Sequence, residues 1–327
     1  MQAVWMILAS FVFATMGVCI KYASLYFNNS EMVFYRGAIG MVFMACYARA
    51  TGTSLRTALP AMHAWRSVIG VMSLSAWFYA ISHLPLATAM TLNYMSSVWI
   101  AAFLVGGSLM LSKTSRRQFF AGPPQEKLAP SGGSALHAVK SVGATPSQGP
   151  LVMTILASFA GVVMLLRPAL DQNQTFAGLI GLLSGLGAAF AFMQIMAISR
   201  MGEPETRTVF YFAMGTVVAG GAGMLVFGVS PWNWQHAIWL PPLGILASRG
   251  PRCLTKAYSM SQNHGSTLMV ANLQYSGIIF AAIYSVVLFG DRIPLMGWAG
   301  MALIVLSAIA ATVLRARAAP DAPAEEH

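Results

Sequence analysis

Long apolar stretches separated by short polar turns run along almost the whole sequence. Most of them have about the 17–25 residues that an α-helix needs to cross the hydrocarbon of a bilayer. The turns between them are rich in Pro, Gly and Asn, as in His83-Leu84-Pro85 and Gly202-Glu203-Pro204. We therefore predict an all-α integral membrane protein with ten transmembrane helices, at residues 3–23, 32–49, 66–82, 87–111, 151–167, 175–199, 207–228, 237–258, 266–289 and 294–314.

The composition agrees with a chain that lies in a lipid bilayer. Its 327 residues are 57% hydrophobic and only 9% charged, whereas soluble domains carry roughly 25% charged residues. The net charge of +10 comes from Lys and Arg that lie mostly in short loops, so we expect no nucleic-acid partner. The cysteines are scattered and show no CxxC pair, so we expect no disulfide framework, metal or other cofactor.

Basic residues are distributed unevenly between alternate loops. One set of loops holds most of them, Arg66 and Lys113 among them, whereas the other set holds only Lys21, Arg167 and Arg292 near the ends of spans. Cytoplasmic loops of membrane proteins carry an excess of Lys and Arg. We therefore predict a multi-pass protein of the cell (inner) membrane with both termini in the cytoplasm.

The sequence contains a weak internal repeat. Val33-Phe34-Tyr35 recurs as Val209-Phe210-Tyr211, an offset of 176, and Ile100–Phe103 aligns with Phe280–Ile283 at an offset of 180. These offsets predict two five-helix halves, and because five is odd the second half enters the membrane inverted. Inverted repeats are typical of alternating-access transporters, whose substrate sites lie between the repeats near mid-membrane. A duplication without a transport role is the alternative.

The offset between equivalent residues of the two halves is smaller for the fifth span, because extra residues separate the fourth and fifth spans. The fifth and tenth spans align through Ser158 and Ser307 at an offset of 149. The intervening segment is rich in Gly, Pro, Ser and basic residues, which predicts a disordered cytoplasmic loop or, alternatively, a regulatory or partner-binding segment. The predicted organisation is helices 1–4 of the first repeat at 1–111, the loop at 112–150, helix 5 at 151–168, the second repeat at 169–315 and a cytoplasmic tail at 316–327.

Short motifs follow one another in a recognisable order within these spans. They are the first-span stretch ending in Lys21, Phe34-Tyr35-Arg36, Leu84–Ala89, Ser158–Pro168 and Gly290–Pro294. In this order the chain resembles the drug/metabolite transporter superfamily, specifically its EamA-type ten-helix members. The resemblance implies export or exchange of amino acids or other small metabolites. The chain departs from that pattern in its long loop and in the arginines of its eighth span.

Polar side chains inside the predicted spans are the candidates for a substrate site, because a charge in hydrocarbon costs about 2.5–3.5 kcal/mol. Arg36 either binds an anionic group or extends to the interface. Arg249 and Arg252 share one helical face beside Pro251, which forms either a carboxylate-binding face or a segment that reaches for the interface.

A second set of candidates is aromatic and amide-bearing. Such a set suits a zwitterionic or aromatic metabolite, and hydrogen bonding between helices is the alternative reason for its presence. Its members are Tyr79, Asn93, Tyr94, Asn272, Gln274 and Tyr275, with Trp77, Trp99, Thr15 and Gln194 as weaker candidates.

No acidic residue is predicted at mid-membrane, since all nine acids fall in loops, tails or span edges. Proton-coupled carriers commonly use a buried Asp or Glu, so we expect facilitated diffusion or exchange of a small-molecule substrate, or coupling through a less usual group. A membrane-embedded enzyme would need clustered His, Asp or Glu, and a channel would need charged rings or filter-like repeats. The sequence favours a transporter over an enzyme, a channel or a scaffold, and it leaves the oligomeric state open.

The predicted topology can be tested by cysteine labelling in a cysteine-free background. Cysteines placed at Gln2 and His327 should react with a membrane-impermeant thiol reagent only after cells are permeabilised, whereas a cysteine at Asn173 should react in intact cells. Labelling of the two chain ends from opposite faces would contradict the inverted arrangement.

Overall fold

The computed structural model describes residues 2–100, 102–103, 149–171, 174–260, 269–270 and 272–318. Every regular element within these residues is a helix. The predicted loop 112–150 lies outside the described residues apart from its last two, which already belong to a helix. Most of the predicted tail 316–327 lies outside them as well.

Most of the predicted spans correspond to one long helix. The helices are α1 (Gln2–Ala23), α2 (Asn29–Thr51), α3 (Pro60–His83), α4 (Leu86–Tyr94), α7 (Gly149–Asp171), α8 (Thr175–Arg200), α9 (Glu205–Phe227), α10 (Trp234–Ala237), α11 (Leu240–Ser259), α13 (Ser276–Val287) and α14 (Leu295–Ala318). The largest shift of a boundary is in α3, which begins at Pro60 because Pro is favoured in the first turn of a helix. Arg66 therefore lies inside α3, and its assignment to a basic loop was wrong.

The predicted helices 87–111 and 266–289 are interrupted at equivalent positions. α4 ends at Tyr94, and the Met95 N–H donates to the Leu92 carbonyl at 3.3 Å in a tight turn before helical residues resume. In the second half the turn lies at residues 274–275, immediately before α13. An offset of 180 superposes the two turns. Discontinuous helices of this kind place backbone polar groups inside the membrane, where they line transporter sites.

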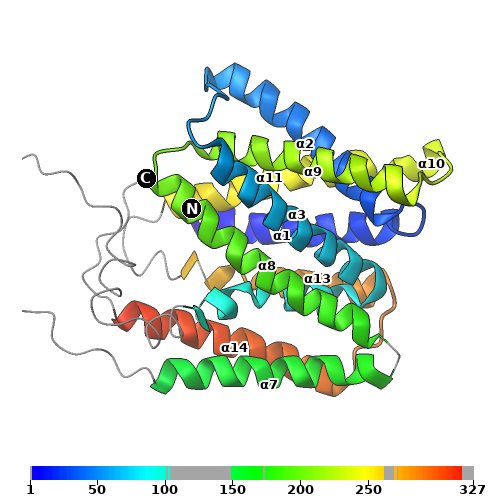
Figure 1. The fold of residues 1–327 in the computed structure, drawn as a ribbon. Coiled ribbons are helices and arrows are strands. Elements are labelled where there is room, and N and C mark those ends of the chain that lie inside the picture. The colour runs from blue at the N-terminus through cyan, green and yellow to red at the C-terminus, as the bar shows by residue number, and fades with distance from the viewer. Residues whose placement is uncertain are drawn as a thin grey trace, which may run out of the picture.

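The helices pack mainly in pairs (Figure 1). α7 and α14 lie side by side as one pair and α2 and α9 as another, while α1 packs on α11 and α3 packs on α8. α13 contacts α4. In addition, α13 contacts α1 and α4 contacts α8. α1 begins and α14 ends at the same end of the bundle (Figure 1). We call this the N-terminal end and the opposite one the far end.

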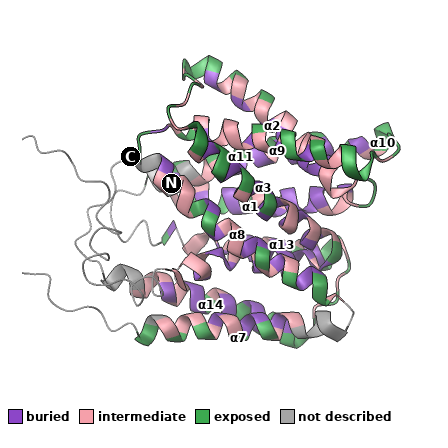
Figure 2. Ribbon diagram, in the orientation of Figure 1, coloured by how far each residue is buried: buried purple, intermediate pink, exposed green. Residues whose placement is uncertain are grey.

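Large apolar side chains cover much of the outside of the bundle. Leu225, Leu295 and Phe227 are 89%, 85% and 77% exposed, and exposed positions recur along peripheral helices such as α7 (Figure 2). By length and composition, Gln2–Ala23, Thr175–Ile195, Glu205–Phe227 and Leu295–Leu314 can each cross a membrane. A water-soluble monomer rarely exposes such apolar patches, so the fold is that of a multi-pass membrane protein.

Glycines allow the α2 and α9 backbones to approach closely. A Cβ at Gly220 would lie 2.6 Å from the backbone nitrogen of Phe34, whereas a Cβ at the neighbouring Gly221 would lie 3.7 Å from the Phe34 ring, an ordinary contact. Small residues at such crossings are what lets transmembrane helices pack tightly.

These two glycines form a matched pair for a stability test. Gly220→Ala should lower the stability of the purified protein by about 1–3 kcal/mol, because the added methyl group forces the two backbones apart. Gly221→Ala should be neutral or slightly stabilising, because alanine favours the helix. Thermal unfolding in detergent measures both, and an equal loss in the two variants would contradict the close approach.

Candidate functional site

The larger cavity opens at the N-terminal end, between α1, α2, α9 and α11. Its volume is about 520 Å³. Arg249 and Arg252, which the sequence predicted as a pair on one face, both line it. The other lining residues are Trp5, Met44, Tyr47, Glu205, Thr206, Val209, Ser248, Pro251, Cys253 and Lys256.

The wall of this cavity is mainly cationic. Arg252 lies 4.0 Å from the centroid of the Tyr47 ring, and Lys256 lies 4.1 Å from that of Trp5, so aromatic faces hold both cations in place. Glu205 is the acid among the lining residues. A cleft lined by charge of one sign raises the local concentration of small solutes of the opposite sign, so this cavity attracts anions.

A smaller cavity lies deeper, between α3, α4, α8 and α9. Its volume is about 150 Å³. Polar groups reach it from Arg66, Ser73, Trp77 and Asn93. The remaining lining residues are Gly70, Leu74, Ala188, Ala191, Phe192, Ile195 and Phe212. A mostly apolar pocket with a few convergent polar groups is typical of a small-molecule site.

Two arginines converge on one aromatic ring beside this smaller cavity. The guanidinium carbon of Arg66 lies 4.4 Å from the centroid of the Phe212 ring, and that of Arg36 lies 5.4 Å from it. Arg66 is only 8% exposed. Within the described residues, Arg36 Nε and Arg66 Nε and Nη1 are buried and have no hydrogen-bond partner. We call Arg36, Arg66 and Phe212 the arginine centre.

The two helix interruptions meet near the middle of the bundle. The Tyr94 hydroxyl lies directly against Gly277, so that a side chain there would overlap it, and the Tyr94 and Tyr275 rings are 6.1 Å apart. Ser10 of α1 donates to the Gln274 carbonyl at 3.2 Å, which satisfies one backbone group of the interruption. Five of the predicted site residues therefore lie at or beside these turns: Asn93, Tyr94, Asn272, Gln274 and Tyr275.

The predicted residues do not form a single cluster. Tyr79 stacks on His83 at 4.1 Å and meets Phe176 at 5.9 Å, and it lines neither cavity. Asn272 lies beside the second interruption, and its side-chain oxygen is buried and has no partner within the described residues. Arg36 joins the arginine centre.

Sequence reasoning missed Arg66 and underrated Trp77. Arg66 is close to the loops that carry most of the positive charge, so its place in the sequence suggested a topological role. The helix start at Pro60 is the signal that places it inside α3. Trp77 lines the smaller cavity, and its indole nitrogen is buried and has no hydrogen-bond partner in the described part of the chain.

Polar contacts draw the helices together at the far end. Lys21 donates to the Leu84 carbonyl at 2.7 Å and forms an ion pair with Asp291 at 3.6 Å. Three of the sequence motifs behind the family resemblance thus meet in space. Asn29 of α2 donates to the Ser75 carbonyl of α3 at 2.9 Å. These bonds join helices that belong to different pairs.

Aromatic stacking adds to the closure of the far end. The rings of Tyr22 and Trp239 stack at 4.7 Å, and those of Tyr26 and His236 stack at 3.5 Å. Both contacts join the end of α1 to the segment around α10. Together with the polar contacts they fill the far end, whereas the N-terminal end holds the larger cavity.

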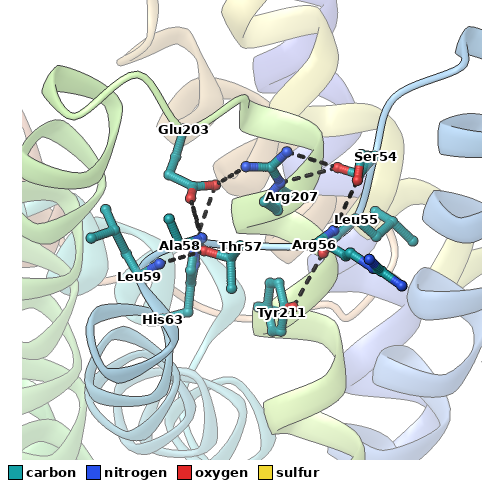
Figure 3. A network of polar contacts seen from close by, with 10 residues as sticks. All are labelled: Ser54, Leu55, Arg56, Thr57, Ala58, Leu59, His63, Glu203, Arg207 and Tyr211. Carbon is teal, nitrogen blue, oxygen red and sulfur yellow. Dashed lines mark hydrogen bonds and ion pairs between the residues drawn. The ribbon is translucent and has the colours of Figure 1, made fainter.

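Glu203 lies at the centre of a polar network at the N-terminal end (Figure 3). Its carboxylate accepts hydrogen bonds from the Thr57 hydroxyl at 2.8 Å, the Ala58 N–H at 3.2 Å and the Arg207 guanidinium at 2.7 Å. Arg207 also donates to the Ser54 carbonyl at 2.9 and 3.0 Å. The network ties the connection between α2 and α3 to the start of α9.

Comparisons with known proteins agree with this membrane fold. No family model matches the chain. It is 27% identical over 304 residues to the pseudopaline exporter of Pseudomonas aeruginosa, covering 93% of both chains. It is 22% identical to an uncharacterized transporter of Helicobacter pylori, covering 93% of this chain and 91% of that one, and 22% identical to the riboflavin transporter of Vibrio cholerae, covering 93% and 90%.

A solved crystal structure has the same fold, with a TM-score of 0.57, 18% identity and coverage of 96% of this chain and 97% of that one. The relatives are named as transporters and not as enzymes. Together with the apolar helices and the cavities, they define the class of this protein, a multi-pass membrane transporter for small molecules.

The Glu203 network generates a pH-dependent prediction. Burial raises the pKa of the Glu203 carboxyl, but hydrogen bonds from Thr57, Arg207 and Ala58 and the charge of Arg207 outweigh it, so the pKa lies below its ordinary value of 4.5. A lowered folded-state pKa means that the network stabilises the fold above about pH 4.5 and loses this contribution as the pH falls through the folded-state pKa.

Glu203→Gln should therefore lower the stability near pH 7 by about 1.5–3 kcal/mol, the range for hydrogen bonds to a charged group. The difference from the wild type should shrink below pH 4.5, as measured by thermal unfolding across pH. Thr57→Ala removes one donor, so its loss of stability should begin at a higher pH than in the wild type. If stability changed with pH in the same way in the wild type and both variants, the lowered pKa could not be assigned to Glu203.

Proposed function

We propose that this protein is an EamA-type carrier that exports or exchanges a small metabolite by alternating access between two inverted five-helix repeats. The repeats would comprise residues 1–168 without the 112–150 loop, and residues 169–315. Two relatives are named for pseudopaline and riboflavin as cargo, and we propose that the cargo of this chain is likewise a small metabolite. The membrane would be the cell (inner) membrane, with both termini cytoplasmic.

Contacts between equivalent residues carry this proposal. Arg36 and Phe212 are equivalent at the offset of 176, and the guanidinium of one lies over the ring of the other. Ser158 and Ser307 are equivalent at the offset of 149, and their hydroxyls are hydrogen-bonded at 2.6 Å. In a two-fold arrangement only residues near the axis touch their own equivalents. Both contacts therefore support a two-fold axis through the α2–α9 and α7–α14 pairs.

Contacts away from this axis occur in equivalent pairs, which gives independent support. α3 packs on α8 as α11 packs on α1, and α4 contacts α8 as α13 contacts α1. Gly215 of α9 lies against Ser67 of α3, while Ile39, the equivalent of Gly215, lies against Gly244 of α11. An unrelated packing of two halves would not reproduce these partners.

The two ends of the bundle differ although the repeats are similar. The larger cavity lies at the N-terminal end, while Lys21, Asn29 and the aromatic stacks close the far end. When inverted repeats exchange conformations, the open and closed ends exchange too. This arrangement supports a state open to the cytoplasm, from which the far-end contacts must break to release cargo outside.

The distribution of acids favours exchange or facilitated diffusion. The acids of the described helices lie at helix ends, as Glu31, Asp171 and Glu205 do, and Glu203 and Asp291 lie in connections. Proton-coupled carriers commonly use a carboxylate relay at mid-membrane. Glu31 is buried, but it lies in the first turn of α2, where it accepts hydrogen bonds from Asn28 and Ser230. The carrier would then draw its energy from the gradients of its cargo.

Cross-linking in a cysteine-free background tests alternating access. The variant Asn29→Cys/Ser75→Cys joins α2 to α3 at the far end, and treatment with a short, cleavable thiol cross-linker should abolish counterflow of metabolites in proteoliposomes. Cleavage should restore it. The control variant Ser158→Cys/Ser307→Cys joins equivalent residues, whose contact is retained when the repeats exchange conformations, so its cross-linking should leave counterflow intact.

Transport should saturate with substrate and should persist when the proton gradient is collapsed. Counterflow that continues in the variant cross-linked at the far end would contradict the alternating-access proposal. Strict dependence on the proton gradient would overturn only the exchange mechanism.

A further inference from the structure

The arginine centre contains two positive charges without acidic partners. Within the described residues neither Arg36 nor Arg66 forms an ion pair. Three of the described acids bond to residues other than these arginines: Glu31 to Ser230, Glu203 to Arg207 and Asp291 to Lys21. A buried charge is unfavourable unless a group of opposite charge and hydrogen bonds compensate it. The compensating group must therefore come from outside the described chain.

The free donors of the arginine centre specify the chemistry of that group. Arg36 Nε and Arg66 Nε and Nη1 are buried N–H groups that have no hydrogen-bond partner among the described residues. A planar guanidinium presents its donors in a fixed fork that matches the oxygens of a carboxylate or phosphate. Both guanidinium carbons lie within 5.4 Å of the Phe212 ring centroid, so a small molecule that carries two anionic groups can span them.

The smaller cavity adds neutral donors beside Arg66. Trp77 Nε1 is buried and has no partner among the described residues, while the Asn93 amide makes only a long hydrogen bond of 3.4 Å to Ser184. The side chains of Phe192 and Ile195 form an apolar part of the wall of this cavity. A volume of about 150 Å³ accommodates a compact group and excludes a large one.

The larger cavity carries the same sign of charge as the arginine centre. Arg249, Arg252 and Lys256 line the larger cavity, and Glu205 is the acid among its lining residues. Anions are therefore attracted into the open end and small cations are repelled. The larger cavity and the arginine centre therefore each favour negatively charged solutes.

We infer that the arginine centre is the substrate-binding site of the proposed carrier and that its substrate is a small organic dianion. Two positive charges in a low-dielectric environment are neutralised by two negative ones, whereas a monoanion or a zwitterion leaves net charge buried. The two negative charges belong to carboxylate or phosphate groups, which the guanidinium fork binds equally well. This inference rests on the proposed function for its transport step but not for its binding step.

Binding is tested on the purified wild-type protein at constant ionic strength. Succinate represents dicarboxylates, glycerol 3-phosphate represents phosphate esters, and acetate and alanine represent a monoanion and a zwitterion. We expect succinate or glycerol 3-phosphate, or both, to raise the thermal midpoint in a saturable manner, and acetate and alanine to have little effect. The solute that stabilises the protein identifies the anionic group.

Variants assign the binding to the arginine centre. Arg66→Gln and Arg36→Gln should each weaken dianion binding by about ten- to a hundredfold, as expected for the loss of a charge-assisted contact. Arg56→Gln, an exposed arginine of the connection between α2 and α3, should leave binding unchanged. Arg66→Lys retains the charge but not the fork, and its binding should fall between that of the wild type and Arg66→Gln. The thermal midpoint without solute reports whether each variant is folded.

Counterflow of the same solutes in proteoliposomes separates the two proposals. Arginine-dependent binding without saturable counterflow would overturn the carrier and retain the dianion site. Counterflow of alanine that is insensitive to Arg66→Gln would retain the carrier and overturn the dianion site. Failure of both dianions to stabilise the wild type, or equal stabilisation of a folded Arg66→Gln variant, would also overturn the site.

Discussion

The close crossing of α2 and α9 is the contact on which the centre of this molecule depends. Gly37 lies against Thr216 and the Ala213 carbonyl, while Gly220 lies against the backbone of Phe34. Without side chains at these glycines the two backbones approach closely enough for van der Waals contact, which is the main attraction between helices in lipid. The crossing also brings Arg36 over the Phe212 ring of α9. A wider separation of the two helices would remove this contact and the arginine centre with it.

The electrostatics of the interior follow from this geometry. Arg66 reaches the same ring from α3, so two cations contact one aromatic ring, and neither forms an ion pair within the described residues. Cation–π contact stabilises each guanidinium only modestly. In a soluble protein, water would screen the two charges, but in the bilayer their cost is high enough to give an anionic ligand a large advantage. In the proposed site, the same two side chains would bind the ligand and fix its position.

Sequence reasoning worked best where a local pattern is sufficient. The apolar stretches predicted membrane helices, and the described helices agree with most of the predicted spans. The interruptions after Tyr94 and before Ser276 were not predicted, because the polar residues beside them, such as Asn93 and Gln274, were interpreted as site or packing residues of continuous spans. The turn near Tyr275 is accompanied by a hydrogen bond from Ser10 of α1, a partner far away in the sequence. Polar residues therefore mark these positions in the sequence, but they do not by themselves specify a break in the helix.

The candidate site was predictable by residue type and only partly by position. Of the predicted site residues, Arg249 and Arg252 line the larger cavity, Asn93 lines the smaller one, and Arg36 lies over the Phe212 ring. Tyr79 belongs to the same residue class but lies against His83.

The sequence by itself determined that this protein lies in a lipid bilayer, because the length and apolarity of a helix follow from residues that are neighbours in the chain. It also determined that charged residues are few, at 9% of the chain. Only the tertiary structure decided that Arg66 joins Arg36 at Phe212, that the motifs containing Lys21 and Asp291 meet, and that one end is open. Such contacts join helices far apart in the chain, and their geometry depends on which backbones can approach each other.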